Sequence, residues 1–318
     1  MGGCPRFLLS ASIKSFLVNR RFWSKLAAKI DRAMHGPTPV QQYSDNTLDS
    51  TRMEDCLLRI QVSEEELQLA VFDYGVRQFL LVERYSLSKG FSGATTEQLI
   101  ARILRQHSLL RLPFKKREAI LISAGWNIIP NAFYQSGQAE MMLRSTRGIP
   151  EKARFLHAAF PERGFTLVGS FPEITTEVLE AELPGIQPVF YLKPLLEQIF
   201  LNDTPQSVYV FVQDFRADLI AVMDGKLRMA NTFRFQTPEE FVYFVILAYD
   251  ALEWSRDLCA LTLCGDIEAG SALYQSAYKY IRHISFLQRP EEPAVPADGK
   301  TGAAMPPHFF LNLLYPPQ

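Results

Sequence analysis

The feature that most constrains the fold of this chain is a strand pattern that occurs twice. Residues 67–75 read Leu-Gln-Leu-Ala-Val-Phe-Asp-Tyr-Gly, and residues 218–225 read Asp-Leu-Ile-Ala-Val-Met-Asp-Gly. Both contain Ala-Val-x-Asp shortly before a turn glycine. Both also lie within three consecutive apolar runs, which predict three strands joined by tight turns. In the second half these runs cover residues 208–236.

The correspondence continues beyond the strands. Residues 95–98 (Thr-Thr-Glu-Gln) and 237–240 (Thr-Pro-Glu-Glu) each begin a predicted helix with a capping box, in which Thr and Gln or Glu side chains satisfy helix N–H groups reciprocally. An apolar strand that ends in glycine follows each helix, over residues 119–125 and 260–265. The order β-β-β-α-β thus occurs twice, about 140–150 residues apart, an offset too long for a solenoid repeat. We predict two similar α/β subdomains with mixed sheets.

A duplicated unit of this kind resembles the actin-like ATPase (ribonuclease H-like) fold. More narrowly, the chain resembles the DUF3822 family of uncharacterised Bacteroidetes proteins. The motifs are Tyr-Ser-Asp-Asn-Thr-Leu-Asp at 43–49, Ile-Ile-Pro-Asn-Ala-Phe at 128–133, and the stretch from Asp-Gly-Lys-Leu at 224–227 to Thr-Pro-Glu-Glu-Phe-Val-Tyr at 237–243. The resemblance covers residues 43–315. It implies an actin-like fold and no assigned function.

The predicted domain boundaries follow the changes in composition. Residues 1–50 are a basic N-terminal extension and linker that we expect to be disordered. Residues 51–204 form the first actin-like subdomain and 205–289 the second. Residues 290–318 are a flexible Pro-rich linker followed by an apolar C-terminal peptide. We expect residues 125–134 to be an irregular connection.

Charge and cysteine content limit the function classes. Residues 1–35 carry seven basic side chains and one acidic side chain, so the remaining residues have a net charge of about −7. Nucleic-acid binding is disfavoured because it needs a basic footprint. The basic segment is either an untranslated or disordered extension preceding Met34, or an amphipathic helix that contacts anionic lipid. Four scattered cysteines and no apolar run long enough to span a bilayer favour a cytoplasmic protein.

The actin-like resemblance implies three nucleotide loops, and the chain departs from two of them. Active relatives carry Asp-x-Gly in the first two turns, where glycine lets the backbone approach phosphate. Here residues 61–66 and 213–218 contain no glycine but several carboxylates. The residues of this degenerate cleft are Ser63, Glu64, Asp214, Arg216, Asp218, Gly265, Asp266 and Gly270. We predict no hydrolysis and no resident cofactor or metal, with weak ATP and Mg²⁺ binding as the alternative.

Two apolar segments are candidate partner-binding surfaces. The first follows the fourth predicted strand and the second is the C-terminal peptide. Their residues are Trp126, Ile129, Phe133, Tyr134, Phe309, Phe310 and Leu314. Each segment either packs on its own domain or binds a protein partner. The five histidines are too scattered for a metal site.

The combined prediction is a non-catalytic, cytoplasmic binding or scaffold protein whose partner is an unidentified protein. One alternative is a divergent ATPase or phosphotransferase that uses Asp214, Asp218 and the Gly265 loop. Another is membrane attachment, which would involve only residues 1–35. The partner's identity and the oligomeric state do not follow from the sequence.

Overall fold

The computed structural model describes residues 37–45, 50–88, 94–123, 125–149, 151–202, 205–298 and 301–317. The chain divides into two compact units, residues 1–38 and 39–318, and every element below belongs to the second unit. The predictions of disorder or lipid contact for residues 1–35 lie outside the described residues. No helix in the described part of the chain is long and apolar enough to cross a membrane.

The first sheet has six strands in the order β1-β4-β3-β2-β5-β9. Strands β2, β3 and β4 form an antiparallel meander, whereas β5 pairs parallel to β2 and β9 parallel to β5. The strands are β1 (Gln41–Ser44), β2 (Cys56–Val62), β3 (Glu66–Asp73), β4 (Gln78–Ser86), β5 (Lys116–Leu121) and β9 (Gln187–Phe190).

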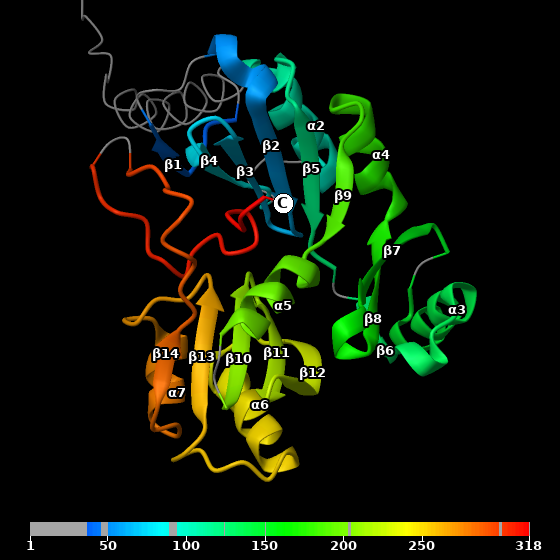
Figure 1. The fold of residues 1–318 in the computed structure, drawn as a ribbon, viewed down its shortest axis with the longest axis vertical. Coiled ribbons are helices and arrows are strands. Elements are labelled where there is room, and N and C mark those ends of the chain that lie inside the picture. The colour runs from blue at the N-terminus through cyan, green and yellow to red at the C-terminus, as the bar shows by residue number, and fades with distance from the viewer. Residues whose placement is uncertain are drawn as a thin grey trace, which may run out of the picture. The chain divides into compact units, whose positions relative to one another are not determined.

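The second sheet repeats the core of the first. Its order is β12-β11-β10-β13-β14, so β12-β11-β10-β13 matches β4-β3-β2-β5 in order and in relative strand direction (Figure 1). Its strands are β10 (Gln206–Gln213), β11 (Arg216–Met223), β12 (Lys226–Arg234), β13 (Ala260–Gly265) and β14 (Ile284–Phe286). Helices α2 (Thr96–Gln106) and α6 (Pro238–Ala251) occupy equivalent places between the third and fourth strands. The predicted β-β-β-α-β order is therefore present twice.

The shared sequence motif lies at the end of the second strand of each meander. The pairing register shifts by one residue beside the motif in both sheets, between Val71 and Phe72 where β4 has the extra residue Leu80, and between Ala221 and Val222 where β12 has the extra residue Arg228. The motif carboxylate then enters the turn: Asp73 accepts from the Gly75 N–H at 2.6 Å, whereas Asp224 itself has φ 52°. The motif thus marks a bulge and a tight turn.

Both predicted helix N-termini are present. Thr95 and Gln98 form the complete capping box of α2. At α6 the Thr237 hydroxyl accepts from the Glu240 N–H at 3.2 Å, but the Glu240 carboxylate accepts from the N–H of Gln236, one residue earlier than a capping box requires.

A third sheet, in the order β6-β8-β7, corrects the prediction for residues 125–134. This stretch contains strand β6 (Gly125–Pro130), which pairs with β8 (Phe165–Pro172), and β8 also pairs with β7 (Ala153–Phe160). Its partner strand lies about 40 residues away in the chain, so local sequence carried little sign of the pairing. The remaining helices are α3 (Ser136–Arg147), α4 (Glu173–Glu182), α5 (Leu192–Leu201) and α7 (Ala272–Tyr278).

Two segments expected to be disordered or flexible follow the edge of the first sheet instead. Residues 41–44 form β1, inside the predicted disordered extension. In the predicted flexible linker, the Ala294 carbonyl accepts from the Phe79 N–H at 2.9 Å, and the Ala297 carbonyl accepts from the Ser44 N–H at 3.3 Å. Edge strands carry unpaired backbone groups, and these groups hold both segments in place.

The last residues of the chain cover one face of the first sheet. We call residues 305–315 the C-terminal segment, which runs back from the second sheet to the first (Figure 1). The sheet and segment side chains that pack together are Leu57, Ala70, Phe72, Phe79, Val82, Met305, Phe309, Phe310, Leu313 and Leu314. Helix α2 packs in the cluster on the opposite face, with Leu58, Ile60 and Leu69. The strands alternate between the two faces and are apolar on both, so both faces need a covering layer.

Replacing Gly265 by Ala should destabilise the fold. Gly265 has φ +86°, and a Cβ there would lie 2.1 Å from the Val212 carbonyl oxygen. We expect Gly265→Ala to lower the free energy of unfolding by about 2–5 kcal/mol. Gly270→Ala is the matched control, because nothing lies within 4 Å of its Cβ position, and its change should stay within about 0.5 kcal/mol. Urea denaturation measures both, and equal stabilities would contradict this account of Gly265.

Truncating the C-terminal segment's buried side chains should also be costly. Leu313 is 0% exposed, so Leu313→Ala leaves a cavity and should cost about 2–5 kcal/mol of unfolding free energy. Leu201, which is 76% exposed, provides the control Leu201→Ala, for which we expect a change of about 0.5 kcal/mol or less. A Leu313→Ala protein as stable as the control would show that the segment is not docked in solution.

Candidate functional site

The structure brings the two predicted phosphate turns together. The β2–β3 hairpin turns at residues 63–65, where the Ser63 N–H donates to the Glu66 carbonyl at 2.9 Å. The β10–β11 hairpin turns through Asp214 and Phe215 alone, with Asp214 at φ 53°. Gln61 joins the two hairpins, since its Nε2 lies 3.0 Å from Gln68 Oε1 and 3.3 Å from Gln213 Oε1. Ser63, Glu64, Asp214 and Arg216 line one small pocket between them.

The space between the hairpins is too small for a nucleotide. The pocket measures about 40 Å³, whereas pockets that hold cofactors and similar molecules typically measure about 300–1,000 Å³. Polar side chains occupy the rest of the junction, and Gln61, Gln68 and Gln213 are all nearly buried.

Glu66, Asp214 and Asp266 form an acidic cluster between the two sheets, and Arg84 of β4, which no sequence motif indicated, pairs with two of these carboxylates. Arg84 Nε lies 2.7 Å from Glu66 Oε2, and Arg84 Nη2 lies 2.5 Å from Asp266 Oδ2. Burial raises the pKa of Asp266 to about 6, with Glu66 adding to this and Arg84 opposing it. Burial also raises the pKa of Asp214 to about 7, and the charges of Glu66, Asp266 and Glu65 act in the same direction. This acidic cluster therefore has one compensating guanidinium.

Asp218, a predicted cleft residue, is buried and forms an ion pair within the protein. It is 1% exposed, and Arg216 Nη2 donates to Asp218 Oδ2 at 2.8 Å. The hydroxyl of Tyr191, the residue that precedes α5, donates to the same oxygen at 3.0 Å and also contacts Arg216. Asp218 therefore serves as the counter-ion of a buried arginine. Among the described residues, no group of three or more His, Cys, Asp or Glu side chains could hold a metal ion.

The C-terminal segment contacts the third predicted loop. The Gly265 N–H donates to the His308 carbonyl at 3.2 Å, and the Asp266 N–H donates to the Val212 carbonyl at 2.8 Å. His308 Nε2 lies 2.7 Å from the Ile267 carbonyl, so this ring nitrogen carries the hydrogen. Burial lowers the pKa of His308 and so favours the neutral ring. The first amide of the loop is thus already bonded within the chain, while Gly270 lies in an open turn before α7.

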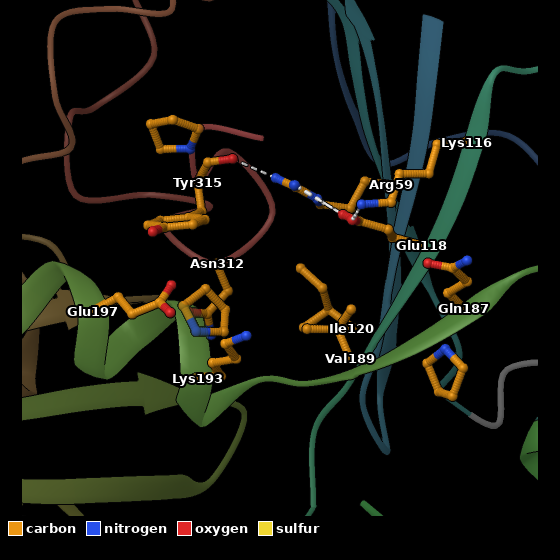
Figure 2. Close-up of a pocket in the computed structure, with 13 residues that line it drawn as sticks. Arg59, Lys116, Glu118, Ile120, Gln187, Val189, Lys193, Glu197, Asn312 and Tyr315 are labelled. Carbon is orange, nitrogen blue, oxygen red and sulfur yellow. Dashed lines mark hydrogen bonds and ion pairs between the residues drawn. The ribbon is translucent and has the colours of Figure 1, made fainter. Parts of the chain in front are cut away.

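Arg59 fixes the end of the C-terminal segment beside a second pocket (Figure 2). This pocket measures about 230 Å³ and lies among β2, β5, β9, α5 and the segment. Arg59 Nε donates to Glu118 Oε2 at 2.9 Å, and Arg59 Nη1 donates to the carbonyls of Leu313 and Tyr315. Gln198 of α5 donates to the Leu311 carbonyl at 3.1 Å. Phe309, Phe310 and Leu314, predicted as a partner surface, are buried on the chain's own sheet.

The other predicted partner surface is divided between core and solvent. Trp126 and Ile129 are 2% and 6% exposed, because they point to opposite faces of β6, Trp126 into the main core and Ile129 into a smaller cluster with α3. Tyr134 is half-buried, and its hydroxyl lies 2.9 Å from His157 Nδ1. Phe133 is 77% exposed. Strand formation therefore separates the four side chains, and Phe133 is the one that remains available.

The sequence of this chain matches a known protein family. Residues 45–284 match the family described as "Protein of unknown function (DUF3822)". A Bacteroides thetaiotaomicron VPI-5482 protein with an actin-like ATPase fold and unknown function is similar at a TM-score of 0.69 and 16% identity, over 76% of this chain and 94% of that chain. The predicted actin-like fold is thus confirmed.

Two further solved structures are similar at lower TM-scores. The PilM-PilN type IV pilus biogenesis complex matches at 0.43 and 14% identity, over 74% of this chain and 89% of that chain. The ethanolamine utilization protein EutJ from Carboxydothermus hydrogenoformans matches at 0.41 and 8% identity, over 79% and 86%. No curated protein matches the chain.

The acidic cluster predicts a specific pH dependence of stability. Asp214 has a folded-state pKa of about 7 against an ordinary value of 3.8, so the folded state binds the extra proton between these values. The resulting penalty on folding is absent below pH 3.8, grows as the pH rises, and is complete above pH 7. Asp214→Asn removes it. We expect the variant to gain about 2 kcal/mol of unfolding free energy relative to wild type between pH 4.5 and pH 8.

Urea denaturation at several pH values measures this difference. Asn also tolerates the positive φ of position 214, which adds a pH-independent offset to the difference in unfolding free energy. Only the change of this difference with pH therefore reports on the carboxylate. A difference that does not change with pH would contradict the raised pKa.

Proposed function

The chain belongs to the DUF3822 family of proteins of unknown function, and from the geometry of its hairpins we propose that it is a non-catalytic binding or scaffold protein. The observation that carries this proposal is the junction of the two hairpins. It has no glycine, encloses about 40 Å³, and is surrounded by carboxylates from both sheets.

Electrostatics oppose polyphosphate at this junction. Two like charges about 4 Å apart at a protein surface repel by about 4 kcal/mol, which equals the whole binding free energy of a millimolar ligand. Glu64, Glu65 and Glu66 sit on one hairpin and Asp214 on the other, whereas the glycines that would admit phosphate are missing. A bound cation would offset part of this repulsion. Arg84 already neutralises part of the acidic cluster by pairing with Glu66 and Asp266.

The groups needed by the alternative function, a divergent phosphotransferase, are engaged elsewhere. Asp218 is paired with Arg216, and the Gly265 amide is bonded to His308. Asp214 remains, with a pKa of about 7. A single carboxylate without a neighbouring metal ligand set or phosphate loop supports no phosphoryl transfer.

A scaffold role needs an accessible surface rather than a cleft. In the described part of the chain, Phe133, Leu201 and Leu258 are each more than 70% exposed. They lie on different elements and offer separate apolar contact points for a protein partner. The protein partner and the cytoplasmic location belong to the same proposal, while membrane contact through residues 1–35 is the second candidate.

Nucleotide titration tests the proposal. We expect no turnover of ATP or ADP with Mg²⁺. At about 1 mM nucleotide we also expect no binding of the kind that Asp214→Ala would weaken. Isothermal calorimetry and a phosphate-release assay on the full chain measure both. ATP or ADP turnover that Asp214→Ala abolishes would overturn the non-catalytic proposal in favour of the phosphotransferase. Saturable ATP binding without turnover would contradict the expectation that the hairpin junction admits no nucleotide.

A further inference from the structure

A third pocket, larger than the two described above, shares Arg216 with the small pocket between the hairpins. It measures about 580 Å³ and is bounded by the third sheet, the end of α3, the end of β5 and strands β11 and β12. We call it the basic pocket, and the side chains that define it are Arg147, Lys152, Ser170, Arg216, Thr232 and Arg234.

The charges of the basic pocket are unlike those of the rest of the chain. Four of its lining residues are cationic and one, Glu64, is anionic. Arg234 is paired with Glu64. Arg147 and Lys152 are exposed and form no ion pair with the residues that the structure describes. Residues 36–318 together carry a net charge of about −7, so this concentration of positive charge is local.

Arg216 supplies a fixed donor at the base of the pocket. Its side chain is 11% exposed. Its Nε donates to Thr232 at 3.0 Å and its Nη2 to Asp218, and these bonds hold the guanidinium plane. Its third nitrogen, Nη1, forms no hydrogen bond within the described ranges. A held guanidinium with an unused N–H pair is suited to a phosphate or carboxylate oxygen.

The part of the lining formed by Ser123, Gly125 and Ser170 is held by close packing and hydrogen bonds. The Ser123 and Ser170 hydroxyls donate to the Gly125 carbonyl at 2.9 Å and 3.2 Å. A Cβ at Gly125 would lie 2.4 Å from Ile149 Cδ1, so β6 and the end of α3 approach closely there. Such a lining is organised before a ligand arrives, which lowers the entropic cost of binding.

We propose that the basic pocket binds a small organic anion with a phosphate or carboxylate group on an apolar body. The exposed Arg147 and Lys152 would attract the anion, and Arg216 would bond to it. Phe171 and Phe233, which also line the pocket, would contact the apolar part. The volume lies within the usual range for small-molecule sites. A protein partner would instead need about 800 Å² of its own surface in contact, so a small molecule fits better.

The proposal does not rest on the non-catalytic function. The small pocket between the hairpins and the basic pocket share the lining residues Glu64, Ile122, Arg216 and Arg234, but Asp214 lines only the small pocket, and Arg147 and Lys152 line only the basic pocket. Asp214→Ala therefore reports on the hairpin junction, and changes at Arg147 and Lys152 report on the basic pocket.

Calorimetric titration of the full chain at low ionic strength tests the proposal. The probes are inorganic pyrophosphate for phosphate chemistry and citrate for carboxylate chemistry. We expect at least one to bind saturably, and Arg147→Ala/Lys152→Ala to weaken it about 10- to 100-fold through two lost charge-assisted hydrogen bonds. Lys279→Ala/Arg282→Ala is the control, because it removes the same charge from exposed positions outside the pocket.

Each outcome decides the proposal. Binding of pyrophosphate alone, citrate alone or both, selectively weakened in the pocket variant, supports it and identifies the chemistry. If neither probe binds at about 10 mM, where even weak sites are occupied, the proposal fails. It also fails if the pocket and control variants weaken binding equally, because the effect is then one of net charge.

Discussion

The burial of the second face of the first sheet is the constraint on which the rest of the structure depends. Leu57, Ala70 and Phe72 lie on this face, and it also carries the buried polar residues Arg59, Gln61 and Gln68. An apolar surface with polar groups in it is stable only when a layer covers it and satisfies those groups. The C-terminal segment covers the face, and its carbonyls accept from Arg59. Gln61 and Gln68 instead bond to each other, to Gln213 and to Glu66.

That arrangement makes the two halves of the chain depend on each other. To reach the first sheet, the C-terminal segment passes the loop after β13, where the His308 carbonyl accepts from Gly265. Helix α5, which precedes β10, packs in the same core cluster as Tyr209 and Phe211 of the second sheet. The chain thus crosses between the sheets twice. These crossings connect the two sheets, and the hydrogen bond between Gln61 and Gln213 joins their hairpins.

Charge is separated around this junction. Carboxylates gather on the Arg84 side, where burial raises the pKa of Asp214 and Asp266. Cations gather on the other side, around the basic pocket. The Arg216–Asp218 pair lies between them and is bonded to Tyr191. In this actin-like fold the two hairpins are arranged around internal ion pairs, and their turns contain no glycine.

The sequence by itself determined the repeated β-β-β-α-β order, both helix N-termini and the family. These features depend on patterns that extend over only a few residues, namely strand alternation, turn glycines and Thr caps. Tertiary structure alone decided the rest. Strand β6 forms only because β8 returns beside it, so Trp126 entered the core rather than a partner surface. Arg84, Arg59 and Tyr191 belong to no motif, and their partners lie from 18 to 256 positions away. Local patterns determine the backbone conformation, but long-range packing determines which charged side chains pair with one another.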